Sequence, residues 1–171
     1  MIPGRDRRAF EEFVAASADR LVRSAYLLCG DRGDAEDIVQ TALLRTARRW
    51  RVARQAPEAY ARRVVVNLAK DRWRNLARRP VVAPIDDVDP PAAVSVVDGV
   101  LDRDELLRAA AQLPPGQRAV LVLRFFDDLP VDETAAALGC SPGTVKSQTS
   151  RALERLRAAL VPEKENADVD R

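Results

Sequence analysis

The chain contains the segment VDETAAALGCSPGTVKSQTSRALERLRAAL at residues 131–160, which predicts two helices joined by a tight turn. Three consecutive alanines, residues 135–137, are small enough to let the first helix approach a partner closely. Gly139 permits the positive φ that a tight turn needs. Ser141 can cap the second helix, in which Pro142 suits the first position. The segment therefore predicts a helix-turn-helix.

The second of these helices carries polar residues in its N-terminal half. Its apolar residues predict a buried stripe, formed by Val145, Leu153, Leu156 and Leu160. In a recognition helix the exposed N-terminal half meets base edges in the major groove. Lys, Arg, Gln, Ser and Thr side chains bind phosphates or bases. We predict duplex DNA contacts from Gly143, Thr144, Lys146, Ser147, Gln148, Ser150 and Arg151. The alternative is an ordinary helical hairpin with a polar surface.

Charge alternates along the chain, although the formal net charge is only +2. Residues 45–79 hold twelve basic and two acidic residues, and residues 141–160 hold four basic residues and one acidic residue. Between them, residues 80–105 hold seven acidic residues and one arginine. Clustered positive charge indicates a polyanionic partner. The alternative is a solvated, arginine-rich surface in a protein from a GC-rich genome.

Five further helices are predicted by apolar residues at helical spacing, over residues 10–28, 34–50, 57–78, 101–113 and 119–126. Gly30 can end the first, Asp34 can cap the second, and Pro57 fits the first turn of the third. Four prolines and four aspartates in residues 80–98 predict a semi-extended linker. The predicted fold is all-α, with two small helical modules joined by this Pro/Asp-rich linker.

The helix predicted at 57–78 presents one polar face. Arg63, Asn67, Lys70 and Arg74 recur at steps of four, three and four, which places them on the same side, and Asp71 joins its edge. This face lies in the more basic of the two positive blocks.

The amino-acid composition argues against an enzyme. The chain has no histidine, Gly-rich phosphate loop or metal-ligand cluster, so we expect no catalytic residue, no metal site and no cofactor. The adjacent carboxylates Asp127 and Asp128 are expected to cap a helix or be solvated. Cys29 and Cys140 are far apart, and a reducing compartment suits them. Since neither a membrane span nor a signal peptide is evident, we expect a cytoplasmic protein.

Three motifs in sequence order resemble those of the extracytoplasmic-function sigma factors of bacterial RNA polymerase, in an actinobacterial subgroup. DAEDIVQTALLRTARRW (34–50) resembles the family's polymerase-binding helix, and APEAYARRVVVNLAKDRWRN (56–75) resembles its promoter-melting and minus-10 region. LPPGQRAVLVLRFFDDLPVDETAAALGCSPGTVKSQTSRALERLR (113–157) resembles its minus-35 module. Gln148 and Thr149 depart from the Arg and Leu of many relatives, which puts the minus-35 sequence in question.

The resemblance implies a sigma factor that binds the polymerase core, reads minus-10 and minus-35 elements and helps to melt DNA. It implies a region-2-like module at 8–78, a linker at 79–101, a region-4-like helix-turn-helix at 102–161 and a disordered tail at 162–171. The implied partners are promoter DNA and the polymerase core, through the coiled coil of its largest subunit and its flap, and an anti-sigma factor is a further candidate.

By position, the resemblance assigns polymerase contacts to Asp34, Asp37, Gln40 and Leu44. It assigns minus-10 contacts to Arg51, Arg54, Arg63, Asn67, Lys70, Asp71 and Arg74. An extruded base needs a receiving pocket, and Trp50, Tyr60 and Trp73 could offer a stacking face or belong to the core.

A one-component repressor or activator is the main alternative function. Such a protein would need a dimerisation or ligand-binding module, whereas residues 8–78 present a basic helix face. We further expect the acidic segment to fold back on the basic blocks, so that the free protein binds promoter DNA poorly until the polymerase core separates the modules.

Overall fold

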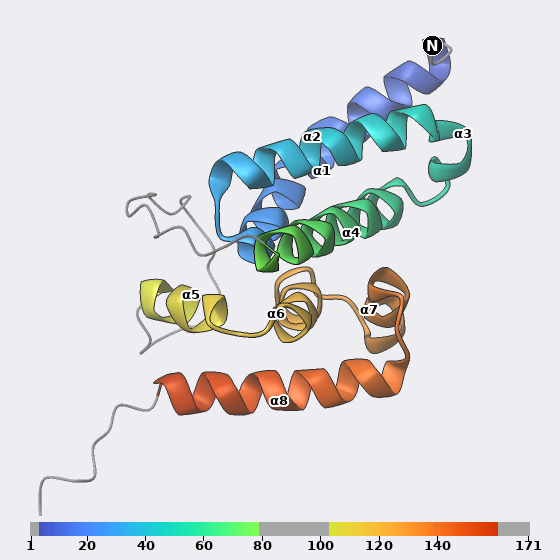
Figure 1. Ribbon diagram of the computed structural model, residues 1–171. Helices are drawn as coiled ribbons and strands as arrows, with labels where there is room; N and C mark the ends of the chain where they lie inside the picture. Colours follow the sequence, from blue (N-terminus) through green and yellow to red (C-terminus); the bar gives the residue numbers. More distant parts are fainter. Residues whose placement is uncertain (1–3, 79–102, 161–171) are drawn as a thin grey trace, which may run out of the picture.

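The computed structural model describes residues 4–78 and 103–160, and every regular element in those ranges is helical. The first group comprises α1 (Gly4–Cys29), α2 (Arg32–Arg48), α3 (Trp50–Ala53) and α4 (Pro57–Ala77). The second comprises α5 (Arg103–Ala111), α6 (Pro115–Leu121), the π-helical turn η1 (Val122–Phe126), α7 (Val131–Leu138) and α8 (Pro142–Leu160). In Figure 1 the two groups lie against each other, with α4 above α6 and α7. The all-α prediction is confirmed, while the predicted linker and tail fall outside the described residues.

Short-range signals explain where the N-terminal helices begin and end. Gly30 adopts φ 78°, and its amide donates to the carbonyl of Tyr26 at 2.7 Å, which ends α1. The predicted cap of the next helix was wrong, because Asp31 is the N-cap of α2 and accepts from the amide of Asp34 at 2.8 Å. Pro57 occupies the first turn of α4, as predicted.

Both tryptophans belong to the core or pack against it. Trp50 is buried, and its ring meets Phe10 edge-on at 5.3 Å and lies 6.0 Å from Phe13. The indole of Trp73 donates to the carbonyl of Leu28 at 3.2 Å. Burial removes Trp50 from the candidates for base stacking, and packing is its role here.

The helix-turn-helix has the predicted turn but a different buried stripe. Gly139 adopts φ 67°, and Ser141 Oγ accepts from the amide of Thr144 at 3.1 Å. Val145 is fully buried against Val120 and Ala135. Of the remaining predicted stripe, Leu153, Leu156 and Leu160 are only half-buried, and Ala152 is buried instead. A small residue fits there because α8 packs closely on its neighbours.

The apolar run predicted as one helix at 119–126 is divided. Pro115 is the first residue of α6, and the π-helical turn η1 follows directly. In η1 the hydrogen bonds span five residues, so the amide of Asp127 donates to the carbonyl of Val122 at 2.9 Å. Phe125 is left half exposed, whereas Asp127 is buried. The expectation that Asp127 is solvated or caps a helix was therefore wrong, because its partners lie on α1 and α4.

A single hydrophobic core joins the two groups of helices. It holds residues of α1, α2 and α4, such as Leu28, Val39 and Val65, together with four residues from the second group: Ala119, Val122, Leu123 and Leu129. A smaller core of Val120, Ala135 and Val145 supports α7 and α8. The second group thus packs against the first while keeping a small core of its own.

Candidate nucleic-acid interface

The polar face of α4 is exposed as the periodicity predicted. Arg63, Asn67, Asp71 and Arg74 are all exposed, and Arg74 Nη2 lies 2.8 Å from Asp71 Oδ1. The opposite side of α4 holds Ala61, Val65, Val66 and Ala69 in the core. An exposed row of two arginines and an amide on a rigid helix suits contact with a phosphate backbone and with bases.

Lys70 behaves differently from the rest of this face. Its Nζ donates to the carbonyl of Leu138 at 2.6 Å, at the C-terminal end of α7. Loss of water around the side chain lowers the pKa of Lys70, the charge of Arg74 lowers it further, and Cys140 opposes the change. In this structure a backbone carbonyl of the helix-turn-helix therefore binds Lys70, which is one of the residues predicted to contact the minus-10 element.

The segment before α4 presents further cationic groups. Arg51 is exposed, as is Arg54, whose Nη1 lies 3.6 Å from Asp6 Oδ1 on α1. Val52, between them, is 70% exposed. Tyr60, near the start of α4, is half-buried. Arg51 is thus exposed, while Arg54 is exposed and held near Asp6 of α1.

The N-terminal half of α8 is open to solvent. Gly143, Thr144, Lys146, Ser147 and Arg151 are exposed, whereas Gln148 is half-buried. The hydroxyls of this region bond locally, with Ser147 Oγ donating to the carbonyl of Thr144 at 3.0 Å. Lys146 and Arg151 thus remain available to an external partner.

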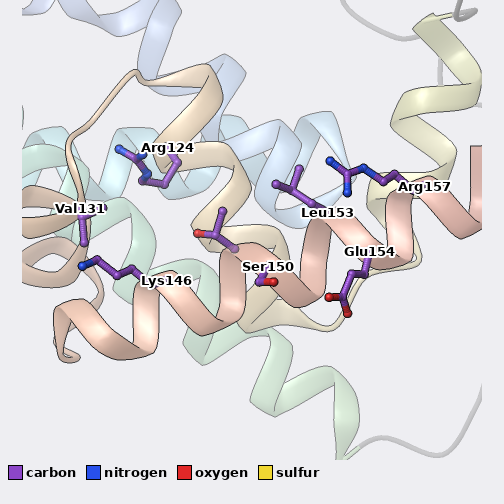
Figure 2. Close-up of a pocket in the computed structure, with 8 residues that line it drawn as sticks. Arg124, Val131, Lys146, Ser150, Leu153, Glu154 and Arg157 are labelled. Atoms are coloured by element: carbon purple, nitrogen blue, oxygen red, sulfur yellow. The ribbon is translucent and has the colours of Figure 1, made fainter.

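A hollow of about 400 Å³ lies beside α8. Figure 2 shows Arg124, Lys146 and Arg157 among its lining residues together with the acidic Glu154, so η1 and α8 both contribute cationic groups to its border. Arg124 also donates to the carbonyl of Leu129 at 2.5 Å, which fixes its position. Sequence reasoning missed Arg124, because only the tertiary structure brings this residue to the hollow beside α8. The only indication in the sequence is that Arg124 is a charged residue within the apolar segment 119–126.

The residues assigned to polymerase contact divide into two kinds. Asp37, Gln40 and Leu44 are exposed on one side of α2, and Leu44 is 61% exposed. Asp34 instead forms an ion pair with Arg72 of α4. Three of the four residues thus form a free surface, and the fourth is held between α2 and α4.

Neither a metal centre nor a membrane span emerges within residues 4–78 and 103–160. No group of three or more Cys, Asp or Glu residues there could hold a metal ion. None of the helices described has both the length and the apolar character required to cross a bilayer.

Comparison with known proteins identifies the family. Residues 13–79 match the family Sigma-70 region 2, and residues 103–156 match Sigma-70, region 4. The chain is 42% identical over 154 residues to the RNA polymerase sigma-E factor of Streptomyces coelicolor, covering 89% of this chain and 86% of that protein. The chain belongs to the sigma-70 family of RNA polymerase sigma factors. It is also 34% identical to the ECF RNA polymerase sigma factor SigM of Mycobacterium tuberculosis, over 91% of this chain and 79% of the relative.

Solved structures agree with the fold of this sigma factor. The sigma factor RpoE of Bartonella quintana, crystallised with the anti-sigma factor NepR, superposes with a TM-score of 0.70 at 24% identity, covering 91% of this chain and 98% of that one. CnrH in complex with the cytosolic domain of CnrY gives a TM-score of 0.62 at 25% identity, over 90% and 88% of the chains. Because RpoE is only 24% identical to this chain, its similarity supports the fold and nothing further.

The resemblance to extracytoplasmic-function sigma factors is thereby confirmed, and so is its actinobacterial character. This protein is an RNA polymerase sigma factor that directs promoter-specific transcription, with RNA polymerase and promoter DNA as its partners. The alternative of a one-component repressor or activator is set aside.

Proposed function

We propose that this sigma factor reads its promoter with two helix faces, α4 at the minus-10 element and α8 at the minus-35 element. One observation carries the proposal: two basic, exposed helix faces lie on the two parts of the chain that match regions 2 and 4. Each face has a buried opposite side that fixes its orientation.

At the minus-10 element, the proposed contacts are Arg51, Arg54, Arg63, Asn67, Lys70, Asp71 and Arg74. Arginines neutralise phosphates, and the amide of Asn67 can hydrogen-bond a base that has left the stack. Asn67 is exposed and has two cations of the same face as neighbours along the helix, Arg63 and Lys70. We therefore assign base reception to Asn67 and phosphate contact to the arginines.

At the minus-35 element, the proposed contacts are Gly143, Thr144, Lys146, Ser147, Gln148 and Arg151. Lys146 and Arg151 are five residues apart, about 140° around the helix, so they cannot both point straight into the groove. One binds phosphate while the other reaches a base edge. Arg124 joins this set because it lines the same hollow as Lys146.

For the polymerase core, the proposed contact surface is Asp37, Gln40 and Leu44, with Asp34 at its edge. Leu44 is 61% exposed on a helix whose Ile38, Val39 and Ala42 already supply the core face, so its side chain is free to contact a partner. The coiled coil of the largest subunit is the expected partner for this surface, and the flap is the expected partner for the second module.

The proposal also covers the domain boundaries, the cellular location and a further protein partner. We assign residues 8–78 and 102–161 to two modules, which residues 79–101 connect along the chain. The factor acts without catalysis of its own, in the cytoplasm. An anti-sigma factor is a further proposed partner, since the RpoE and CnrH structures contain NepR and CnrY.

In vitro transcription tests the proposal. Purified polymerase core with and without this factor is given a genomic library, and the transcripts are sequenced. A shared pair of promoter elements upstream of factor-dependent transcripts is expected. A factor that fails to bind core, or transcripts without a common element, would overturn the proposal.

A further inference from the structure

The hollow beside α8 is lined by one side of that helix and by two residues that precede the helix. The lining residues of α8 follow one another at steps of one to three, so that they form a single stripe: Lys146, Thr149, Ser150, Leu153, Glu154 and Arg157. Arg124 of η1 and Val131 of α7 complete the lining. From Lys146 to Arg157 the stripe covers about three turns, or roughly 16 Å along the helix axis.

Three cations and one carboxylate line the hollow, so its charge is net positive. In Figure 2, Arg124 and Lys146 lie toward the start of α8, whereas Glu154 and Arg157 lie toward its end. Among the residues that the structure describes, none of these four side chains forms an ion pair. Their charges are therefore available to an external partner, and the excess of cations favours an anionic one.

Arg124 is fixed in position before any partner binds. Its Nη1 donates to the carbonyl of Leu129 at 2.5 Å, and its Cζ lies 6.0 Å from the centroid of the Phe125 ring. A guanidinium has five N–H donors, so most of them remain for another acceptor. Since its planar group is already oriented, Arg124 loses little side-chain freedom on binding a phosphate.

The length of the stripe places its two ends at different parts of a DNA duplex. Only the N-terminal part of a recognition helix meets base edges. The major groove is about 12 Å wide and about 8.5 Å deep. A side chain roughly 16 Å farther along the axis than Lys146 therefore lies outside the groove, where phosphates line its edge. Arg157 occupies that position.

We propose that the hollow binds the phosphate backbone of promoter DNA beside the minus-35 bases, with Arg124 and Lys146 at one phosphate, Arg157 at another, and Glu154 weakening the contact. The proposal rests on the proposed function for the entry of α8 into the major groove. It also assigns the two roles that helix geometry leaves open. Lys146 lines the hollow and takes phosphate, whereas Arg151 lies outside the lining and reads a base.

Glu154 distinguishes this site from a purely basic strip. A carboxylate close to a phosphate is repelled by it, and salt screens the repulsion. Because phosphate contacts carry no sequence information, Glu154 lowers the affinity for every DNA sequence alike. Base reading by the start of α8 then supplies a larger share of the binding, and the factor is held less tightly on DNA outside its promoters.

A salt series tests the site, using holoenzyme formed from polymerase core and the full-length factor. The probe is a promoter fragment recovered from factor-dependent transcription. Arg124→Ala and Arg157→Ala should each weaken binding roughly five-fold and lower the slope of log affinity against log salt by about one unit. Glu154→Gln should tighten binding roughly two- to five-fold. Arg155→Ala and Glu105→Gln, at exposed positions outside the lining, are the charge-matched controls and should match the wild type.

The three effects should be equal on fragments with altered minus-35 bases, and affinity for core without DNA should not change. Because Arg157 is exposed, Arg157→Ala should keep the wild-type melting temperature. An unchanged slope in Arg157→Ala, or weaker binding by Glu154→Gln, would overturn the site. Loss of core affinity without DNA would assign the hollow to a protein partner and overturn it as well. Wild-type holoenzyme that ignores the minus-35 bases would instead contradict the proposed function, a result that the variants' slopes cannot produce.

Discussion

The helices α4 and α8 both carry a proposed DNA face, yet they differ in how free that face is. On α8 the exposed residues bond only within the helix start, and Lys146 and Arg151 are open to solvent. On α4 the face is divided, since Asn67 is exposed while Lys70 is bound to the carbonyl of Leu138. The difference teaches that helical periodicity places polar residues on one face, whereas tertiary contacts decide which of them stay free, as at Lys70.

The largest expected effect tests whether α4 opens DNA. Asn67→Ala should lower promoter opening roughly ten- to hundred-fold, because an extruded base would lose a hydrogen bond at its pocket. Closed-complex affinity should hardly change. Permanganate reactivity of unpaired thymines, measured beside a gel shift, separates these steps, with Asn75→Ala as the control on the same helix. Normal opening by Asn67→Ala would show that this face merely follows the backbone.

The equivalent change on α8 should affect reading without affecting opening. Gln148→Ala is expected to cost about 1–3 kcal/mol at one minus-35 position and little elsewhere, since an amide can pair with adenine through two hydrogen bonds. Competition binding on promoters mutated position by position measures this. Gln112→Ala, at an exposed residue beyond α5, is the matched control. Equal losses at every position would assign Gln148 to packing, consistent with its half-buried state.

A third surface lies outside both DNA faces. Leu44→Asp should weaken binding to polymerase core roughly ten-fold, because a charge replaces an apolar contact, and the melting temperature should stay near that of the wild type, since Leu44 is exposed. Leu76→Asp, at another exposed leucine, is the comparison. Unchanged core affinity would exclude Leu44 from the interface, and a large loss of stability would place it in the core.

Phosphate contact predicts a smaller, uniform effect. If Lys146 binds phosphate, Lys146→Ala should weaken all promoters alike and lower the slope of log affinity against log salt by about one unit. Arg151→Ala should then change sequence preference instead. The two slopes, measured by anisotropy over a salt series, decide the assignment, and Arg155→Ala serves as the exposed reference on α8. Sequence-dependent losses from both variants would contradict the division of roles.

The smallest effect is expected from the cysteines. Burial raises the pKa of Cys29, so little thiolate is present at neutral pH, although the backbone of Asp31 and the charge of Arg72 oppose the change. Both cysteines are free thiols. Peroxide should therefore change promoter activity equally in the wild type and in a double Cys→Ser variant. A response confined to the wild type would reveal a redox switch.

Local signals made much of the fold predictable. Gly139, Ser141 and Pro57 act through the conformation and hydrogen bonds of their own helix ends, and each was found where the pattern indicated. The exposed rows on α4 and α8 follow from helical periodicity alone. Asp31 was missed as a cap because Asp34 and Asp31 both suit that position, and the geometry of the first turn selects between them.

Tertiary contacts could not be predicted in this way. Asp127 looks like half of a solvated pair in the sequence, and its burial depends on Arg20 and Arg62, which lie far away along the chain. Likewise, Arg124 lines the hollow beside α8 only because the tertiary structure brings the two segments together. The expected masking of DNA faces by the acidic segment involves residues outside those described, and α7 supplies a different contact at Lys70.

The core shared by the two groups of helices has a calorimetric consequence. Residues such as Leu123 and Leu129 are buried against the N-terminal helices and would meet water if the two groups of helices came apart. Exposing apolar surface raises heat capacity, whereas burying it on a partner lowers it. If binding to polymerase core parts the two groups, the heat-capacity change of association should be less negative than the interface alone would produce. The size of that difference would measure the apolar surface that the two groups of helices bury against each other.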